Sequence, residues 1–272
     1  MRTVESPANP MVRRMRELHT PAGRREQRAF LIEGTRLVAE AVAASWPLLA
    51  VLYDPKKAAL DSRLDQLVRQ IPNATPASPR AIKQASETVS PQGIVAAAEI
   101  PPPARQVDLE EPIVLIMDGL ADPGNAGTLL RSALAAGVKT VLVSKGSVDI
   151  FSPKVVRSGM GAHFRLKLGV EYTWQELKQI LGKTRPVVVA EAGSDLQYYR
   201  YNWHRPAALV VGGEAHGPSP EALRLASARI SIPLEGGVES LNAAVAGSVI
   251  LFEAKRQRDM QGGKCAGPSS AD

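Results

Sequence analysis

The stretch IVLIM at residues 113–117, followed by DGLADPGN at residues 118–125, decides how the larger part of the chain folds. Five consecutive apolar residues without polar alternation are typical of a parallel strand that is buried on both faces. Similar runs, separated by helical patterns, recur at residues 140–144, 187–190, 208–211 and 230–233. The region from residue 112 to residue 260 therefore predicts an α/β domain with a mostly parallel sheet, helices on both faces and a last helix over residues 240–260.

The region before residue 100 predicts a second, smaller α/β domain. Its expected strands lie at residues 30–34, 49–53 and 93–98, and an expected helix lies at residues 35–44. Three consecutive prolines at 101–103 exclude a helix interior or a central strand. We therefore expect domains at 1–100 and 112–260, a linker at 101–111, and a tail at 261–272 with the composition of disorder.

Arginines are concentrated near the start of the chain, on a segment where Met11, Met15 and Leu18 recur at helical spacing. The residues Thr20 to Gly23 interrupt this helix. The arginines between residues 13 and 28 are Arg13, Arg14, Arg16, Arg24, Arg25 and Arg28. Such a cluster can neutralise RNA phosphates, and the alternative is a solvated helix face without a partner.

The composition narrows the classes of function. The formal net charge of +6 favours a polyanionic partner. The single cysteine, Cys265, excludes an intrachain disulfide framework and a multi-cysteine metal site. No apolar run approaches the ~20 residues that cross a bilayer, and residues 1–5 lack the apolar core of a signal peptide. We therefore expect a cytoplasmic protein. We also expect no metal, because the four histidines show no ligand spacing.

Three loops carry the glycines and polar side chains that are typical of a ligand site at the carboxyl ends of parallel strands. These loops span residues 118–133, 209–220 and 230–246. We expect Asn125 to cap the helix after the first loop and Ser240 to cap the helix after the third. Each loop alone also fits a purely structural interpretation, as a turn, a helix cap or close helix packing.

Taken together, the three loops resemble the three signature motifs of the SpoU methyltransferases within the SPOUT superfamily. These motifs are Asn-x-Gly with an arginine four residues after the glycine, Gly-x-Glu-x-x-Gly, and Ile-Pro ahead of a Ser-Leu-Asn helix start. The matching residues are Asn125, Gly127 and Arg131, then Gly212, Glu214 and Gly217, and finally Ile232, Pro233, Ser240, Leu241 and Asn242. The first hundred residues are similar to an L30e-like RNA substrate-binding domain that is often fused to SpoU enzymes.

The resemblance implies a deep trefoil knot in the second domain, a homodimer with the site at the subunit interface, and S-adenosylmethionine as the cofactor. It implies transfer of a methyl group to a ribose 2′-hydroxyl of RNA, with ribosomal RNA of the large subunit as the first choice of substrate. By similarity, the cofactor-binding residues are Ala192, Gly193, Gly213, Ile232, Leu234, Leu241 and Ala246. The catalytic candidates are Arg131, Asn125, Glu214, Ser240 and Asn242.

Arg131 is expected to stabilise the developing alkoxide and not to remove the proton, because a guanidinium has a pKa above ~12. One departure from the family pattern is Ala243-Ala244 in place of the usual Val-Ser, which removes a hydroxyl. Three alternatives stay open: a transfer RNA methyltransferase, a resistance enzyme that acts on ribosomal RNA, and a non-catalytic RNA-binding protein of the same fold. A Rossmann-type dinucleotide enzyme is disfavoured, because no Gly-x-Gly-x-x-Gly follows a strand.

Overall fold

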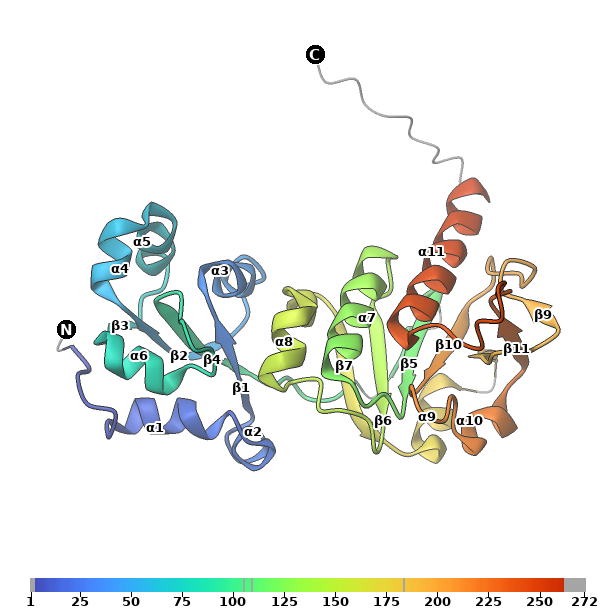
Figure 1. The fold of residues 1–272 in the computed structure, drawn as a ribbon, viewed down its shortest axis with the longest axis horizontal. Coiled ribbons are helices and arrows are strands. Elements are labelled where there is room, and N and C mark those ends of the chain that lie inside the picture. The colour runs from blue at the N-terminus through green and yellow to red at the C-terminus, as the bar shows by residue number, and fades with distance from the viewer. Residues whose placement is uncertain (1–2, 105, 109, 183, 262–272) are drawn as a thin grey trace, which may run out of the picture. The chain divides into compact units, whose positions relative to one another are not determined.

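The structure, a computed structural model, describes residues 3–104, 106–108, 110–182 and 184–261 (Figure 1). The chain divides into two compact units. The first contains the residues up to Pro102 together with Asp149–Arg165, and the second contains Pro103–Val148 and the residues from Leu166 onward. The predicted tail, apart from Gln261, lies outside the described residues. In the described part of the chain, no helix is long and apolar enough to cross a membrane.

The first unit is built on a four-stranded sheet with the strand order β1-β4-β2-β3. Its strands are β1 (Ala29–Glu33), β2 (Leu48–Tyr53), β3 (Ala74–Pro76) and β4 (Ile94–Glu99), and its helices include α3 (Thr35–Ala43), α4 (Pro55–Leu60), α5 (Ser62–Arg69) and α6 (Pro79–Ala85). The predicted strands at 30–34, 49–53 and 93–98 and the predicted helix at 35–44 are confirmed. A proline at the first position and a side-chain cap from Asp54 or Ser78 begin α4 and α6.

The arginine-rich segment forms two helices, α1 (Pro10–Glu17) and α2 (Pro21–Gln27). Pro21 ends the predicted helix and also begins the next one, with the Thr20 side chain as its cap. Five of the six arginines are exposed, but Arg24 is buried. Its guanidinium donates to the Asp149 carboxylate at 2.6 and 2.9 Å and to the Leu18 carbonyl at 2.7 Å. The expectation that Arg24 contacts RNA is therefore wrong, because its donors are used inside the first unit.

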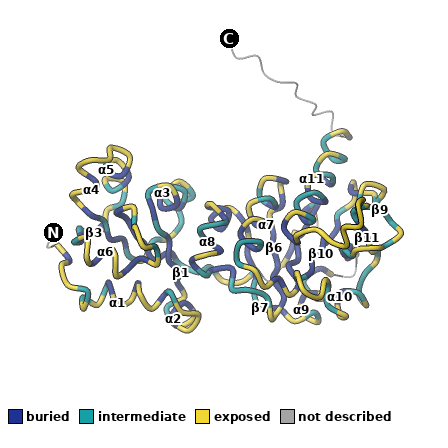
Figure 2. Tube along the Cα trace, viewed as in Figure 1, coloured by how far each residue is buried: buried dark blue, intermediate teal, exposed yellow. Residues whose placement is uncertain are grey.

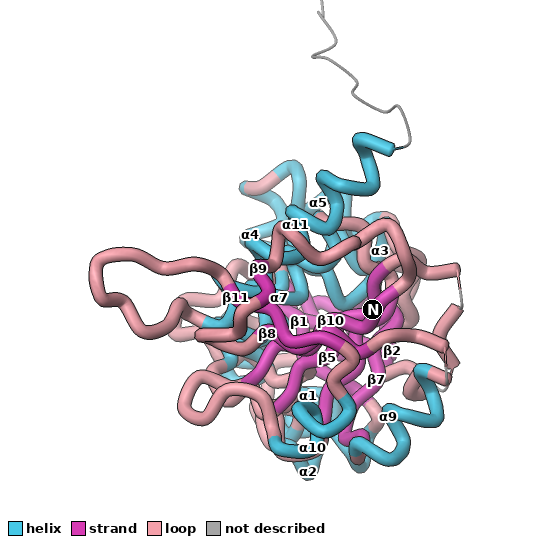
Figure 3. Tube along the Cα trace, turned by 90° about the vertical axis from the view of Figure 1, so that its right-hand side faces the viewer, coloured by secondary structure: helices cyan, strands magenta, loops and turns pink. Residues whose placement is uncertain are grey.

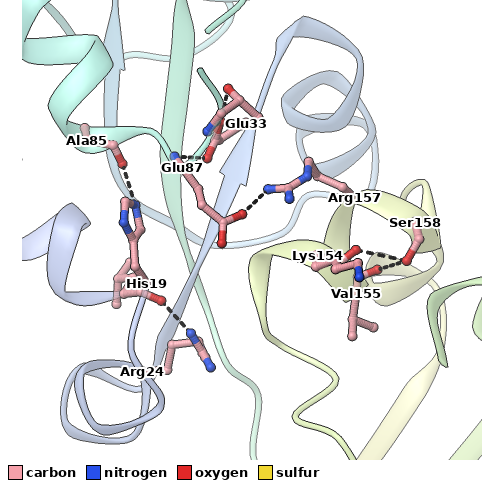
Figure 4. Close-up of polar contacts among 11 residues, drawn as sticks. His19, Arg24, Glu33, Ala85, Glu87, Lys154, Val155, Arg157 and Ser158 are labelled. Carbon is pink, nitrogen blue, oxygen red and sulfur yellow. Dashed lines mark hydrogen bonds and ion pairs between the residues drawn. The ribbon is translucent and has the colours of Figure 1, made fainter. Parts of the chain in front are cut away.

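Residues 149–165, which the sequence pattern places in the second domain, pack within the first unit. They form α8 (Pro153–Gly159) and a 3-10 turn, η1 (Ala162–Phe164). The Phe30 ring contacts the rings of Phe151 and Phe164 at centroid distances of 5.2 and 6.2 Å. Arg157 of α8 pairs with Glu87, whose backbone amide donates to the Glu33 carboxylate (Figure 4). An aromatic core and an ion pair thus attach this segment to the first unit.

The second unit, as far as the structure describes it, contains a parallel seven-stranded sheet with the order β7-β6-β5-β10-β8-β11-β9. The strands are β5 (Ile113–Asp118), β6 (Thr140–Ser144), β7 (Lys167–Tyr172), β8 (Val187–Ala190), β9 (Leu196–Gln197), β10 (Ala207–Gly212) and β11 (Ala228–Ser231). Four of the five strands predicted for this region are confirmed, and the fifth, predicted at 230–233, corresponds to β11, which begins two residues earlier and ends at Ser231. β5, β6 and β10 are buried along their whole length (Figure 2).

Helices cover both faces of this sheet, as predicted. They are α7 (Pro123–Ala135), α9 (Trp174–Leu181), α10 (Pro220–Leu225) and α11 (Ala243–Gln261). α7 and α11 lie on one face, and α9 and α10 lie on the other (Figures 1 and 3). The last helix begins three residues later than the predicted residue 240.

The amino ends of the parallel strands are joined by a buried polar network. Glu111, directly before β5, accepts hydrogen bonds from the Lys139 and Thr140 amides at 2.9 and 2.6 Å and from the Thr140 hydroxyl at 2.7 Å. Arg185, before β8, donates to the carbonyls of Glu111 and Asp108 at 2.6 and 2.8 Å. The predicted linker therefore ends early, because Ala104 and Asp108 are already hydrogen-bonded to Leu168 and Arg185 of the second unit.

Candidate functional site

A cavity of about 370 Å³ lies at the carboxyl ends of the parallel strands in the second unit. Strands β8, β10 and β11 end at it, and the first turns of α11 close it. Its lining residues are Ala190, Glu191, Ala192, Val211, Gly212, Gly213, Glu214, Ala215, Gly217, Pro218, Ile230, Ser231, Ile232, Leu234, Glu239, Ser240, Leu241, Ala243, Ala246 and Ile250. Two of the three motif loops therefore meet in one hollow, and the third is tied to it by hydrogen bonds.

Glycine is required where the second loop passes its neighbours. A Cβ atom on Gly213 would lie 2.2 Å from the Gly119 carbonyl oxygen, and one on Gly212 would lie 2.2 Å from the Pro218 nitrogen. Both contacts are with backbone, so the neighbours could not move aside cheaply. The loop then folds back on itself through a bridge between Gly213 and Gly217. The glycines of the second motif thus let two loops pack directly against each other.

Asn125, Glu214 and Asn242 form a hydrogen-bonded chain that we call the motif junction. The Asn242 amide donates to Asn125 Oδ1 at 2.8 Å, and the Asn125 amide donates to Glu214 Oε1 at 2.6 Å. Glu214 Oε2 accepts from the Ala121 backbone amide at 3.1 Å. One polar side chain from each motif is therefore used to hold the three loops together, although Glu214 and Asn242 are exposed and Asn125 is only half-buried.

The environment of Glu214 favours its charged form. Burial raises the pKa of its carboxyl, but hydrogen bonds from the Asn125 side chain and the Ala121 amide outweigh this effect, so the pKa lies below its ordinary value. Glu214 is therefore a carboxylate at neutral pH. A charged acceptor makes stronger hydrogen bonds than a neutral one, which suits a residue that fixes two loops.

The two predicted helix caps are wrong. Asp122, not Asn125, caps α7, and its carboxylate accepts from the Asn125 backbone amide at 2.8 Å. Asn242, not Ser240, caps α11, and its Oδ1 accepts from the Ala244 and Val245 amides at 2.9 and 3.2 Å. Because the Asp122 carboxylate caps α7, the Asn125 side chain is available for the motif junction.

Six of the seven predicted cofactor-binding residues line the cavity: Ala192, Gly213, Ile232, Leu234, Leu241 and Ala246. Gly193 does not line it; it lines a neighbouring hollow next to β9. Glu214 and Ser240 are the two catalytic candidates at the cavity wall.

Sequence reasoning missed three carboxylates of this region. Glu191 and Glu239 line the cavity, and Asp118, the last residue of β5, is buried. The Asp118 carboxylate accepts from the Ser219 amide at 2.7 Å and from the Trp174 indole at 3.1 Å. An acidic residue at the end of an otherwise apolar strand was the available signal for Asp118, whereas Glu191 and Glu239 carry no motif.

Arg131 stands apart from the other catalytic candidates. It is exposed on α7 and does not line the cavity. Its neighbour Ser132 faces α11, where its hydroxyl is hydrogen-bonded to the Ser248 hydroxyl at 2.7 Å. Since successive helix residues are ~100° apart, the Arg131 side chain leaves α7 to one side of the α11 contact.

The Ala243-Ala244 departure affects packing more than the cavity. Ala243 lines the cavity, but Ala244 is buried away from it. The Ala244 carbonyl accepts from the Ser248 hydroxyl at 2.6 Å. The absence of a hydroxyl at residue 244 therefore affects the packing of α11 against its neighbours. The cavity wall is not affected, because Ala243 is the small residue that lines it.

Known proteins show the same organisation. The SpoU rRNA methylase family matches residues 112–252, and the MRM3-like substrate binding domain matches residues 9–96. The chain is 35% identical to mitochondrial rRNA methyltransferase 3 of Mus musculus, over 86% of this chain and 69% of that protein. It is 30% identical to the 23S rRNA (guanosine(2553)-2′-O)-methyltransferase RlmP of Bacillus subtilis, over 93% of this chain and 98% of that protein.

A solved structure agrees with these matches. The SpoU methyltransferase AviRb from Streptomyces viridochromogenes, in complex with the cofactor AdoMet, is similar with a TM-score of 0.82 and 29% identity, over 92% of this chain and 98% of that one. The family match extends over more than half of the chain and contains all three motif loops. The chain therefore belongs to the SpoU rRNA methylase family.

Proposed function

We propose that this chain transfers a methyl group from S-adenosylmethionine to a ribose 2′-hydroxyl of large-subunit ribosomal RNA. The observation that carries the proposal is the cavity at the strand ends, walled by two motif loops and joined to the third by the motif junction. The names of the two relatives support ribosomal RNA, and RlmP supports the 2′-oxygen. The open alternatives are transfer RNA, a resistance-linked target in ribosomal RNA, and RNA binding without catalysis.

The residues present fit S-adenosylmethionine. The cavity volume of about 370 Å³ lies in the usual range for small-ligand sites. Ile232, Leu234 and Leu241 offer apolar walls for an adenine, and the carboxylates of Glu191 and Glu239 suit the hydroxyl and ammonium groups of the cofactor. When bound, the cofactor supplies an electrophilic methyl group.

The remaining work falls to the side chains of the chain. Asn125, Glu214 and Asn242 hold the loops so that the cavity keeps its shape, and Ser240 contributes a hydroxyl at the wall. Positioning of the 2′-oxygen accounts for much of the acceleration in such a transfer. Arg131 stabilises the negative charge that develops on the 2′-oxygen as its proton passes to water, since a guanidinium keeps its own protons and is no base.

We also propose that the chain acts as a homodimer. Val245 and Phe252 lie seven residues apart on one face of α11, and they are 49% and 47% exposed. Two large apolar side chains in line on a helix favour a protein partner over water. With a dimer interface at α11, Arg131 of one copy can act at the cavity of the other copy. This arrangement fits the position of Arg131 outside the cavity of its own chain.

The five exposed arginines of the first unit supply a phosphate-binding face. They are Arg13, Arg14, Arg16, Arg25 and Arg28. The deep trefoil knot and the separate roles of a substrate-binding and a catalytic domain stay predictions of the family resemblance. The cytoplasmic location stays a prediction of the composition, with which the single cysteine is consistent.

The test is tritium transfer from labelled S-adenosylmethionine to total RNA from cells that lack the gene for this chain. We expect label in the large ribosomal RNA, in dinucleotides that resist alkali because their 2′-oxygen is methylated. Label in transfer RNA would keep the reaction and change the substrate. Absence of label in every RNA, with a folded protein that binds the cofactor, would favour the non-catalytic alternative.

A further inference from the structure

A second hollow of the second unit lies outside the cofactor cavity and is rich in aromatic and basic groups. We call it the Tyr199 groove; it has a volume of about 530 Å³ and is lined by residues 199–202, His204, Arg256, Gln257 and Met260. The chain has five tyrosines and three tryptophans, and three of those tyrosines and one tryptophan fall within residues 198–203. This local concentration has no part in the motifs or in the cavity.

The loop that forms the groove is held in one shape. Trp203 is fully buried, and its indole donates to the Tyr198 carbonyl at 2.9 Å. Gln257 of α11 accepts from the Trp203 amide at 3.1 Å and donates to the Tyr199 carbonyl at 3.2 Å. The Tyr201 ring meets the Trp203 ring edge-on at a centroid distance of 4.7 Å. The groove therefore has a fixed shape, because the buried Trp203 anchors its loop and Gln257 bonds the loop to α11.

The groups that this frame presents to solvent are suited to a nucleic acid strand. The Tyr199 side chain is 44% exposed, and Arg200 and His204 are exposed beside it. Among the described residues, the side chains of Arg200 and His204 have no hydrogen-bond or ion-pair partner. An open aromatic face beside an unpaired arginine binds unstacked bases and phosphates without needing a particular sequence. Duplex RNA, by contrast, keeps its base faces stacked inside.

The position of the groove relates it to the proposed reaction. Ile250 of α11 lines the cofactor cavity, and Gln257 of the same helix lines the Tyr199 groove. Seven residues are two helical turns, so both lie on one face of α11 and are ~10 Å apart along its axis. Resting on the proposed function, we propose that the Tyr199 groove binds a single-stranded RNA segment next to the methylated nucleotide, with a base stacked on Tyr199 and a phosphate at Arg200.

A second copy of the chain is the competing occupant, and the structure places its expected contact elsewhere. Val245 and Phe252 lie ~120–140° around α11 from Gln257. The groove also offers an unpaired arginine and polar groups, whereas a dimer contact is expected to be apolar at its centre. Both points favour RNA in the groove and the partner subunit at Val245 and Phe252.

The experiment measures binding of a fluorescein-labelled, mixed-sequence 12-nucleotide RNA to the full chain by anisotropy. We expect Tyr199→Ala to weaken binding about 5- to 160-fold, the range for loss of one base–aromatic stack. Tyr199→Phe keeps the ring and should bind within about twofold of the unmodified chain. Arg200→Ala should lower the slope of log affinity against log salt by about 0.7, the value for one phosphate on a single strand. Arg224→Ala, an exposed arginine outside the groove, is the matched control.

Two further measurements separate the possible failures. Cofactor binding by calorimetry and subunit mass by light scattering are recorded for each variant. Unchanged RNA affinity in Tyr199→Ala and Arg200→Ala, in a chain that methylates RNA, would overturn the groove and leave the proposed function intact. Conversion of Tyr199→Ala to a monomer would assign the groove to the partner subunit and overturn the proposal. A chain that neither binds the RNA nor transfers a methyl group would contradict the proposed function itself.

Discussion

Glu111 at the amino ends of the parallel strands and Glu214 at their carboxyl ends each accept hydrogen bonds from groups distant in the sequence, but in opposite surroundings. Glu111 is 1% exposed and bonds to regular backbone at the start of β6. Glu214 is exposed and bonds to loops around a cavity. A buried carboxylate with all its acceptors used contributes to stability, whereas an exposed one that shapes a hollow can serve a ligand. The contrast predicts that stability and activity can be changed separately at the two ends of one sheet.

The largest expected effect is on activity at the carboxyl end. Arg131→Ala should lower kcat for methyl transfer about 10²- to 10³-fold, as loss of one group that stabilises developing negative charge usually does. Urea unfolding should be unchanged, because the side chain is exposed on α7. Single-turnover assays with Arg224→Ala as the control would check this. A variant that retains a third of the rate would remove Arg131 from the reaction.

The next effect is on stability at the amino end. Glu111→Ala leaves the buried Thr140 hydroxyl and amide without their acceptor, which should lower the free energy of unfolding by about 3 kcal/mol. Cofactor affinity of the folded protein should stay the same. Glu110→Ala, the exposed neighbour, is the control, and urea titration gives the measurement. Equal midpoints for the two variants would mean that the network contributes nothing.

The third effect is smaller and concerns the contribution of Glu214 to cofactor affinity. Glu214→Gln should weaken S-adenosylmethionine about tenfold, ~1.4 kcal/mol, because one acceptor of the motif junction becomes a donor. Because the pKa of Glu214 is lowered in the folded protein, its carboxylate stabilises the motif junction above the ordinary pKa of 4.5. This stabilisation is lost as pH falls through the lower pKa of the folded protein. Calorimetry should therefore give a Glu214 contribution that is constant from pH 8 to pH 5. A contribution that is lost above pH 5 would show that Glu214 is not held as a carboxylate.

The smallest effect concerns the cap of α11. Asn242→Ala should cost about 1 kcal/mol of stability as the loss of a helix cap, and Ser240→Ala should change stability by less than about 0.5 kcal/mol. Thermal unfolding of the two variants side by side measures the difference. The reverse order would restore Ser240 as the cap.

The predictable parts of the structure are those with a local signal. β5 and β10 were predicted from continuous apolar runs, because burial on both faces leaves no polar residue in the strand. β7 was not, because KLGVEY has neither a long apolar run nor a regular alternation of polar and apolar residues. The two-residue β9 is too short for any periodicity.

One error comes from contact between residues far apart in the chain, and another comes from a choice between two neighbouring cap candidates. Arg24 belongs to a segment of arginines, and nothing near it reveals that Asp149, 125 positions away, neutralises it. The cap of α7 was placed at Asn125 because Asn is a favoured cap, but Asp122 lies earlier and takes that role. Six of the seven cofactor-binding candidates, which the family resemblance implies, line the cavity because the motif loops follow strand ends, and these ends meet in space in a parallel sheet.

The attachment of residues 149–165 to the first unit has a practical consequence for dividing the protein. The backbone passes between the two units at 102–103, 148–149 and 165–166, so a single cut near the prolines separates the sequence without separating the fold. A fragment that starts at residue 104 would carry Phe151 and Phe164 without Phe30, the ring they pack on. Such a fragment would expose apolar rings that invite aggregation. Useful halves of this protein would need a short replacement for residues 149–165 in the catalytic piece, and a grafted copy of the same stretch in the other.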